Sequence, residues 1–156
     1  MEQSGNNFFG LTSYGGCAGR STATIVAFQS LMDGIFFLNS SVTIKDITDG
    51  TSTTLFFGER SRLNLVETNI SVALGGWAWA GPRSAEDHTM NTSVPMEGLQ
   101  LHDMNQFGSQ HSSGRTSNFS FADGSVRSLS SDIAINVFQE LSTRAGGETI
   151  DPSVFD

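Results

Sequence analysis

Residues 118–129, NFSFADGSVRSL, constrain the fold of this chain more than any other stretch. Phe119 and Phe121 alternate with polar residues, as in a strand with one buried face. An Asp-Gly pair then separates this run from a second short run, which is a strong hairpin signal. Glycine accepts the positive φ of a tight turn, and aspartate bonds the turn amides. The residues predicted to have structural roles in this hairpin are Phe119, Phe121, Asp123, Gly124 and Val126.

His111 precedes the hairpin and raises the alternative of a catalytic His/Asp pair with Asp123. Such a pair needs a nucleophile, and the many serines of this chain show no nucleophile-elbow pattern. Turn geometry by itself accounts for Asp123. We therefore predict that His111 is structural, hydrogen-bonding near the hairpin, and that the chain is not an enzyme.

A helix is predicted after the hairpin, from Asp132 to about Arg144, with Ser130 or Ser131 as its N-cap. The pair at 146–147, Gly-Gly, ends it. Apolar residues at spacings of three and four form one face, which we expect to pack on a sheet. This face comprises Ile133, Ala134, Val137, Phe138 and Leu141.

Several strands are predicted upstream of the hairpin. Residues 33–41, DGIFFLNSS, indicate an Asp-Gly turn leading into a strand, and residues 42–45 alternate apolar and polar side chains. Residues 54–58 have the composition of a buried strand, and residues 69–81 predict another. Residues 21–32 fit either a strand or a short helix.

Residues 81–117 show no sustained period and are predicted to be a long excursion over the surface. The expected fold is α+β: a mainly antiparallel sheet with a C-terminal hairpin followed by a helix. At this length, residues 1–156 are expected to form a single domain.

Charge excludes some classes of partner. The formal net charge is −8, and the 8 Lys and Arg residues are scattered, which argues against nucleic acid and anionic membranes. No apolar stretch approaches the ~18 residues of a membrane span. Cys17 is the single cysteine, so it cannot form an internal disulfide, and a small buried residue is the favoured interpretation.

Asp46 and Asp49 lie in an oxygen-rich turn, DITDGTS, of a kind that suits calcium. The spacing is not that of an EF-hand loop, and the alternative is that both carboxylates cap the turn. Calcium at Asp46 and Asp49 is the metal site that the sequence predicts. The three histidines are spaced too widely to predict a transition-metal site.

Trp77 and Trp79 lie two residues apart in GGWAWAG, so in a strand both side chains point to one face. Paired aromatic rings stack on sugars or line a binding cleft, whereas core packing is the alternative. This pair is the predicted ligand face if the chain is a soluble binding module for carbohydrate or another solute.

Two blocks of the sequence resemble a known family. DGIFF followed by DITDGTSTTLFFGER, and the closing block from His111 through NFSFADGSVRSL to TRAGGE, are similar to the prepilin-anchored proteins abundant in planctomycetes. These proteins are filed under a domain of unknown function. Eleven residues separate His111 from Asp123, a longer spacer than the family usually has.

The resemblance implies a pilin-like or pseudopilin-like head domain that is exported to the periplasm or the cell surface. Its implied partners are other pilin-like subunits or proteins of a secretion system. It also implies a structural calcium and an N-terminal apolar anchor helix. This chain is expected to begin after that helix, with Met1 as an artificial start, so the membrane would be reached only through the missing helix.

Overall fold

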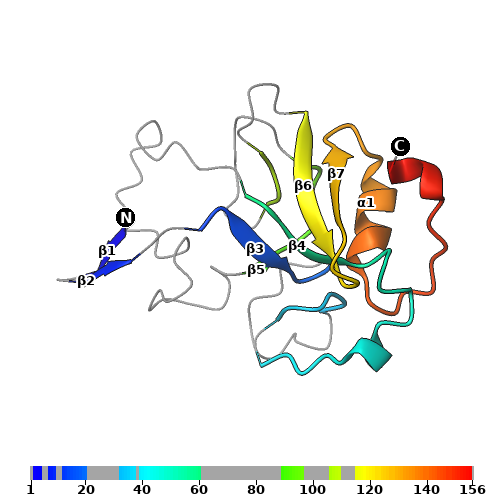
Figure 1. Ribbon diagram of the computed structural model, residues 1–156, viewed down its shortest axis with the longest axis horizontal. Coiled ribbons are helices and arrows are strands. Elements are labelled where there is room, and N and C mark those ends of the chain that lie inside the picture. The colour runs from blue at the N-terminus through cyan, green and yellow to red at the C-terminus, as the bar shows by residue number, and fades with distance from the viewer. Residues whose placement is uncertain are drawn as a thin grey trace.

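The computed structural model of the chain describes residues 2–4, 7–9, 12–20, 32–37, 39–60, 89–96, 106–109 and 115–155. Within them, a five-stranded sheet has the strand order β5-β3-β4-β6-β7 (Figure 1). Its strands are β3 (Tyr14–Cys17), β4 (Leu55–Glu59), β5 (Thr89–Met90), β6 (Thr116–Phe121) and β7 (Val126–Ser130). All neighbouring pairs are antiparallel except β3 and β5, which are parallel.

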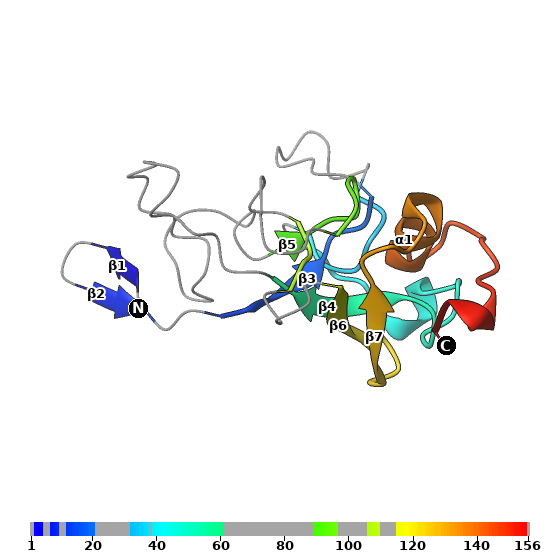
Figure 2. The same cartoon turned by 90° about the horizontal axis from the view of Figure 1, so that it is seen from above.

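The helices are α1 (Ile135–Ser142) and two short 3-10 helices, η2 (Ile44–Asp46) and η5 (Pro152–Phe155). A separate antiparallel pair, β1 (Glu2–Ser4) with β2 (Asn7–Phe9), lies apart from the main sheet in both views (Figures 1 and 2). The predicted α+β class, with a mainly antiparallel sheet and a helix after the last hairpin, is confirmed.

The predicted hairpin is formed by β6 and β7, paired from Thr116↔Ser130 to Ser120↔Val126. Phe119 and Phe121 are buried, as expected from their alternation. Val126 pairs with Ser120 and therefore points to the opposite face of the sheet, where it is 69% exposed. Val126 therefore contributes to the hairpin through its backbone pairing with Ser120 and not through packing in the core.

One face of the sheet is covered by α1, and the core lies between them. The Phe138 ring of α1 lies 5.8 Å from that of Phe119 and 5.9 Å from that of Phe107, both in edge-to-face geometry. Each ring of this kind buries a large apolar area. The buried cluster comprises Cys17, Leu55, Met90, Met96, Phe107, Phe119, Phe121, Leu129, Phe138 and Leu141.

The predicted start of the helix is wrong by three residues. Ala134 occupies the N-cap position and no side chain caps it, so α1 begins at Ile135 instead of Asp132. Ser130 bonds the Asp132 amide at 3.1 Å, and the Ile133 amide donates to the Ser130 carbonyl. The serine therefore caps a turn that precedes the helix. The helix also ends at Ser142, before Arg144.

Residues 42–45 do not form the predicted strand. The Asp46 carboxylate accepts hydrogen bonds from the amide and the hydroxyl of Thr43, both at 2.7 Å, and folds the segment into η2. Residues 34–37 of the predicted strand at 33–41 form a loop whose Gly34, Ile35 and Phe36 amides donate to carbonyls of residues 17–18. The strand predicted at 54–58 is present as β4.

The predicted surface excursion at 81–117 is also partly wrong. Its described portions contribute to the core, because Met90, Thr92 and Phe107 are 1% exposed or less. Met90 lies in β5 at the edge of the sheet, and an isolated bridge joins Asn91 to Gln106. The absence of a repeating apolar pattern hid these single buried side chains. The strand predicted at 69–81 and the segment at 21–31 lie outside the described residues.

The outer face of the sheet, opposite α1, carries a row of polar side chains across four strands. The Glu59 carboxylate accepts hydrogen bonds from Asn118 at 2.8 and 3.0 Å and from the Tyr14 hydroxyl at 3.4 Å. Ser128 donates to the Asn118 side chain at 2.6 Å. These bonds tie β3, β4, β6 and β7 together on the side away from the core.

Next to this row, three half-buried rings form an aromatic group that we call the outer aromatic trio: Phe36, Phe56 and Phe57. Their ring centroids lie 4.7–4.8 Å apart. Phe36 covers Gly16 of β3 so closely that a side chain at that position would overlap the ring. The trio therefore gives one part of the outer face an apolar character.

Candidate functional site

Three of the quoted sequence segments meet at the end of α1. TRAGGE, at residues 143–148, follows the helix, while DITDGTS and the start of DGIFF approach it from the other side. We call this meeting point the motif junction. It contains Asp33, Asp49, Thr143, Arg144 and the amides of residues 146–147. Its geometry decides whether these motifs form an exposed site or an internal joint.

Asp49 is the centre of one half of the junction. Its carboxylate accepts hydrogen bonds from the Gly146 amide at 2.6 Å, the Gly147 amide at 2.8 Å and the Thr143 hydroxyl at 3.1 Å. Gly147 has a φ of 82°, so its amide is presented by a left-handed turn. In return, the Arg144 carbonyl accepts the amides of residues 48 and 49. The carboxylate thus accepts two backbone amides and one hydroxyl, all from the segment that follows α1.

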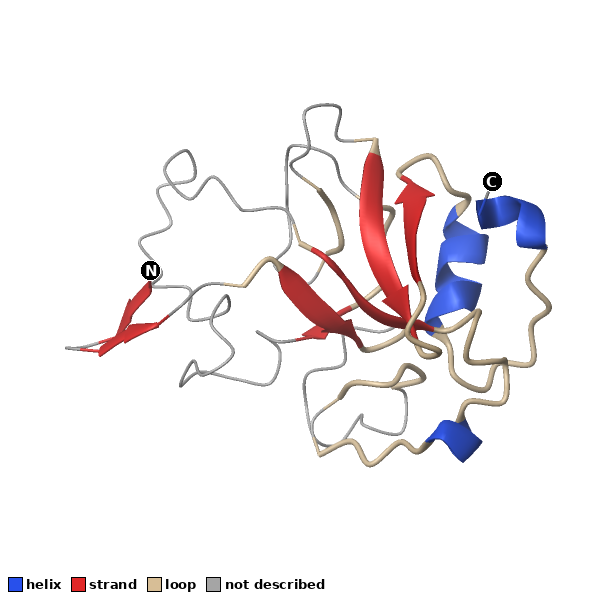
Figure 3. Ribbon diagram, viewed as in Figure 1, coloured by secondary structure: helices blue, strands red, loops and turns tan. Residues whose placement is uncertain are grey.

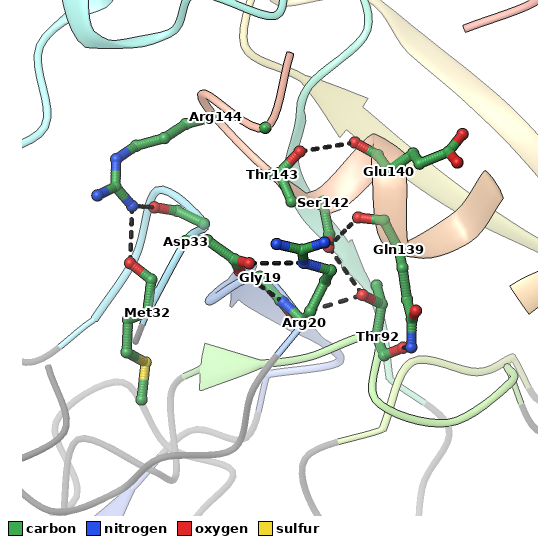
Figure 4. A network of polar contacts seen from close by, with 12 residues as sticks. Gly19, Arg20, Met32, Asp33, Thr92, Gln139, Glu140, Ser142, Thr143 and Arg144 are labelled. Atoms are coloured by element: carbon green, nitrogen blue, oxygen red, sulfur yellow. Dashed lines mark hydrogen bonds and ion pairs between the residues drawn. The ribbon is translucent and has the colours of Figure 1, made fainter. Parts of the chain in front are cut away.

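Arg144 forms the other half of the junction (Figure 4). Its guanidinium donates to the carbonyls of Met32 at 2.8 Å and Gly34 at 2.7 Å, and its amide donates to the Asp33 carbonyl at 2.9 Å. The guanidinium also lies 5.5 Å from the centre of the Phe37 ring. The sequence predicts only that the helix ends near Arg144, because nothing in the local pattern indicates which carbonyls its guanidinium reaches.

The Asp33 side chain binds another cation, Arg20. Its carboxylate accepts hydrogen bonds from the amide of Arg20 at 2.8 Å and from the guanidinium of Arg20 at 2.7 Å. This hydrogen bonding raises the pKa of Arg20. Gly19 and Gly34 lie so close at this crossing that a β-carbon on either would overlap the other segment. Glycine is therefore required at position 19 of GGCAG and at position 34 of DGIFF, because the two backbone segments are in direct contact.

A small buried polar group adjoins the junction, at the face of α1 shown in Figure 4. The hydroxyls of Thr92 and Ser142 lie 2.8 Å apart, and the Gln139 amide group donates to the Thr92 carbonyl at 3.2 Å. Cys17 is buried beside Ser142, and this burial raises the pKa of its thiol to about 12. The thiol is protonated near neutral pH, which agrees with the predicted structural role and not with a nucleophile.

The hairpin turn holds the next group of predicted residues. The Asp123 carboxylate accepts hydrogen bonds from the Ser125 amide at 2.8 Å and the Ser125 hydroxyl at 2.7 Å, which lower its pKa. Gly124 has a φ of 86°, as the turn prediction requires. His111 lies outside the described residues, and so do Trp77 and Trp79.

The two predicted calcium ligands bond to different groups. Asp46 caps Thr43 within η2, and these hydrogen bonds lower its pKa, whereas Asp49 belongs to the motif junction. Within the described part of the chain, no group of three or more His, Cys, Asp or Glu side chains gathers around one point. Calcium binding at Asp46 and Asp49 stays a prediction.

Comparison with known families places the chain. Residues 1–136 match the family described as "Protein of unknown function (DUF1559)", which also carries the short name SBP_bac_10. The chain belongs to this family. No curated protein and no solved structure matches this DUF1559 chain. Among its described helices, none is both long enough and apolar enough to cross a membrane.

Proposed function

We infer that this DUF1559 chain is the non-enzymatic head of an exported, pilin-like protein that works in filament assembly, secretion or adhesion. The motif junction is the observation that carries this inference. Asp33, Asp49 and Arg144 are all engaged in hydrogen bonds to other parts of the same domain. Motif residues that are bonded in this way stabilise a scaffold, and the surfaces of that scaffold are then left to bind other subunits.

The outer face of the sheet supports the same inference. α1 occupies one face, and the outer aromatic trio lies on the other, where Phe56 and Phe57 stay partly exposed. An apolar helix has the complementary surface for such rings, because partly exposed aromatic groups gain from being covered. The resemblance implies an anchor helix of this kind. Other pilin-like subunits or secretion proteins would be the partners, and the anchor helix would provide the contact with the membrane.

The test is the N-terminus and intact mass of the protein isolated from its native cells. We expect a longer chain that starts with a methylated residue and carries an apolar helix of about 20 residues, enough to span a bilayer. Trypsin treatment of whole cells gives a second readout, because a head at the cell surface is cleaved without cell lysis, whereas a periplasmic head is cleaved only once the outer membrane is opened.

A native start near Met1, with no apolar helix ahead of it, would contradict the anchored head. A free binding module would then be the better account, and Trp77 and Trp79 would be its first candidate ligand face. Quenching of tryptophan fluorescence by a panel of glycans would test that module. Replacement of both tryptophans should abolish the quenching if the assignment is right.

A further inference from the structure

A groove of about 460 Å³ lies between α1 and the C-terminal segment that contains η5. The apolar part of its lining includes Ile133, Val137, Ile150 and Val154. Ile133 and Ile150 also pack against the buried cluster, so the floor of the groove is the edge of the hydrophobic core. We call this feature the C-terminal groove. Its floor is suited to an aliphatic side chain.

The rim of the C-terminal groove is acidic. Asp132, Glu140 and Asp151 line it, and none of the described lining residues is a lysine or an arginine. The Asp151 carboxylate accepts a hydrogen bond from the Ser153 amide at 2.9 Å, which lowers its pKa and favours the ionised form. An apolar floor inside a ring of carboxylates is complementary to an aliphatic group next to a cation.

η2 presents such a pair of side chains. Ile44 is 66% exposed, which is unusual for a residue of its size and apolar character. Lys45 follows it, is also exposed, and is the one lysine in the entire sequence. The Asp46 cap on Thr43 and the burial of Ile47 hold the turn in place. A rigid turn loses little conformational entropy when it binds.

We propose that η2 of one copy of this chain inserts Ile44 into the C-terminal groove of a second copy, where Lys45 pairs with the acidic rim. Figures 1 and 3 show η2 at the bottom of the view, below the pair α1–η5. The two surfaces are formed by different residues, so a head-to-tail contact between them is heterologous. Contacts of this type continue into a row of subunits unless the rotation closes a ring.

This contact deepens the proposed function and rests on its assembly role. A contact made only by Ile44 and Lys45 in the C-terminal groove buries less surface than the ~1,000 Å² that a stable complex usually needs. The contact is therefore weak between free domains and becomes effective when subunits are held side by side. For this reason, the test uses covalent trapping at high protein concentration.

Carbodiimide coupling joins a lysine amine to a carboxylate, and Lys45 supplies the single lysine amine of the chain. An equal mixture of ¹⁵N-labelled and unlabelled protein distinguishes links between copies from links within one. We expect mixed-isotope peptides that join Lys45 to Asp132, Glu140 or Asp151. Links from Lys45 that are confined to one copy, or that reach other carboxylates instead, would overturn the proposal.

Two substitutions sharpen the test. Ile44→Asp should lower the yield of linked dimer by about tenfold, the value of burying one large aliphatic side chain. Val126→Asp is the matched control, because Val126 is 69% exposed but lies on β7, away from η2. Its yield should equal that of the unmodified protein. Equal losses in the two variants, or no loss in Ile44→Asp, would contradict the proposal.

Lys45→Arg provides a further control, since it keeps the charge but removes the reactive amine. The Lys45 links should disappear, while the weak association measured by sedimentation at high concentration should persist. Loss of that association in Lys45→Arg, with circular dichroism unchanged, would count against simple charge pairing at the rim. If the native protein has an apolar anchor helix but the Lys45 links are absent, the contact between copies is refuted and the pilin-like head stands. If the Lys45 links form but the native protein has no anchor helix, the pilin-like head is refuted and the contact stands.

Discussion

The Gly147 amide donates a hydrogen bond of 2.8 Å to the Asp49 carboxylate, although 98 residues separate them in the sequence. Together with the Gly146 amide, this bond fastens the end of α1 to the segment before β4. The carboxylate is partly buried, so replacing it leaves backbone donors without an acceptor of the same charge.

Asp49→Asn should therefore destabilise the domain by about 1–3 kcal/mol, the cost of weakening charge-assisted hydrogen bonds to backbone amides. Urea unfolding followed by circular dichroism measures the change. Asp132→Asn is the matched control, because that side chain is exposed, and it should change stability by less than about 0.5 kcal/mol. Equal effects of the two substitutions would show that the Asp49 bonds contribute little.

Arg144→Lys should also destabilise the domain, because the nitrogen Nη1 donates to both the Met32 and Gly34 carbonyls, and a lysine ammonium, one bond closer to the backbone, does not reach the same point. We expect a loss of about 1–2 kcal/mol in thermal or urea unfolding, and a larger loss for Arg144→Ala. If Lys supports full stability at this position, a single charged donor is enough, and the length and planar shape of the guanidinium do not matter.

Gly124→Val should destabilise the hairpin by ~1 kcal/mol or more, because the φ of 86° is strained for a β-branched residue. Nothing lies within 4 Å of the position that a β-carbon would take, so steric overlap does not contribute. Gly124→Asn is the control, since asparagine tolerates positive φ far better. The same unfolding midpoint for both variants would contradict backbone strain as the cause.

Cys17 should resist thiol reagents at about pH 8 in the folded protein and react only on unfolding, because it is buried and its thiol remains protonated. Burial raises the pKa of this thiol from its ordinary value of 9.0 to about 12 in the folded protein. Its contribution to stability is fully present below 9.0. It falls as pH rises from 9.0 toward about 12, because there only the unfolded chain releases the proton.

The comparison of Cys17→Ala with the unmodified protein isolates this pH dependence. The difference in unfolding free energy between the two should shrink as pH rises through that window. A difference that is constant with pH, or rapid labelling of the folded protein, would mean that the thiol is accessible to water.

Calcium at Asp46 and Asp49 is tested by melting curves in chelator and in excess calcium. If the two carboxylates hold the ion, calcium should raise the melting temperature by mass action, and Asp46→Asn should abolish the rise. Coincident curves under the two conditions would refute the site.

The sequence predicted the elements whose structure depends on residues close together in the chain. The β6–β7 hairpin follows from the alternation around Phe119 and from the Asp-Gly turn. η2 was missed because the Asp46 side chain competes with strand pairing by bonding its own backbone neighbourhood. The junction was missed for another reason: the partners of Arg144 are carbonyls over a hundred residues away, and no local pattern specifies them.

The strand order β5-β3-β4-β6-β7 has a consequence for how the chain is made. β4 is central, but one of its two partners, β6, begins only at Thr116, and the amides that bind Asp49 come at 146–147. Closing such long loops is slow compared with forming local contacts. A growing chain therefore has a central strand with an open edge until β6 has been synthesised. We expect ribosomal products that stop short of Gly147 to be cleared by proteases, because the amides that bind Asp49 are then missing.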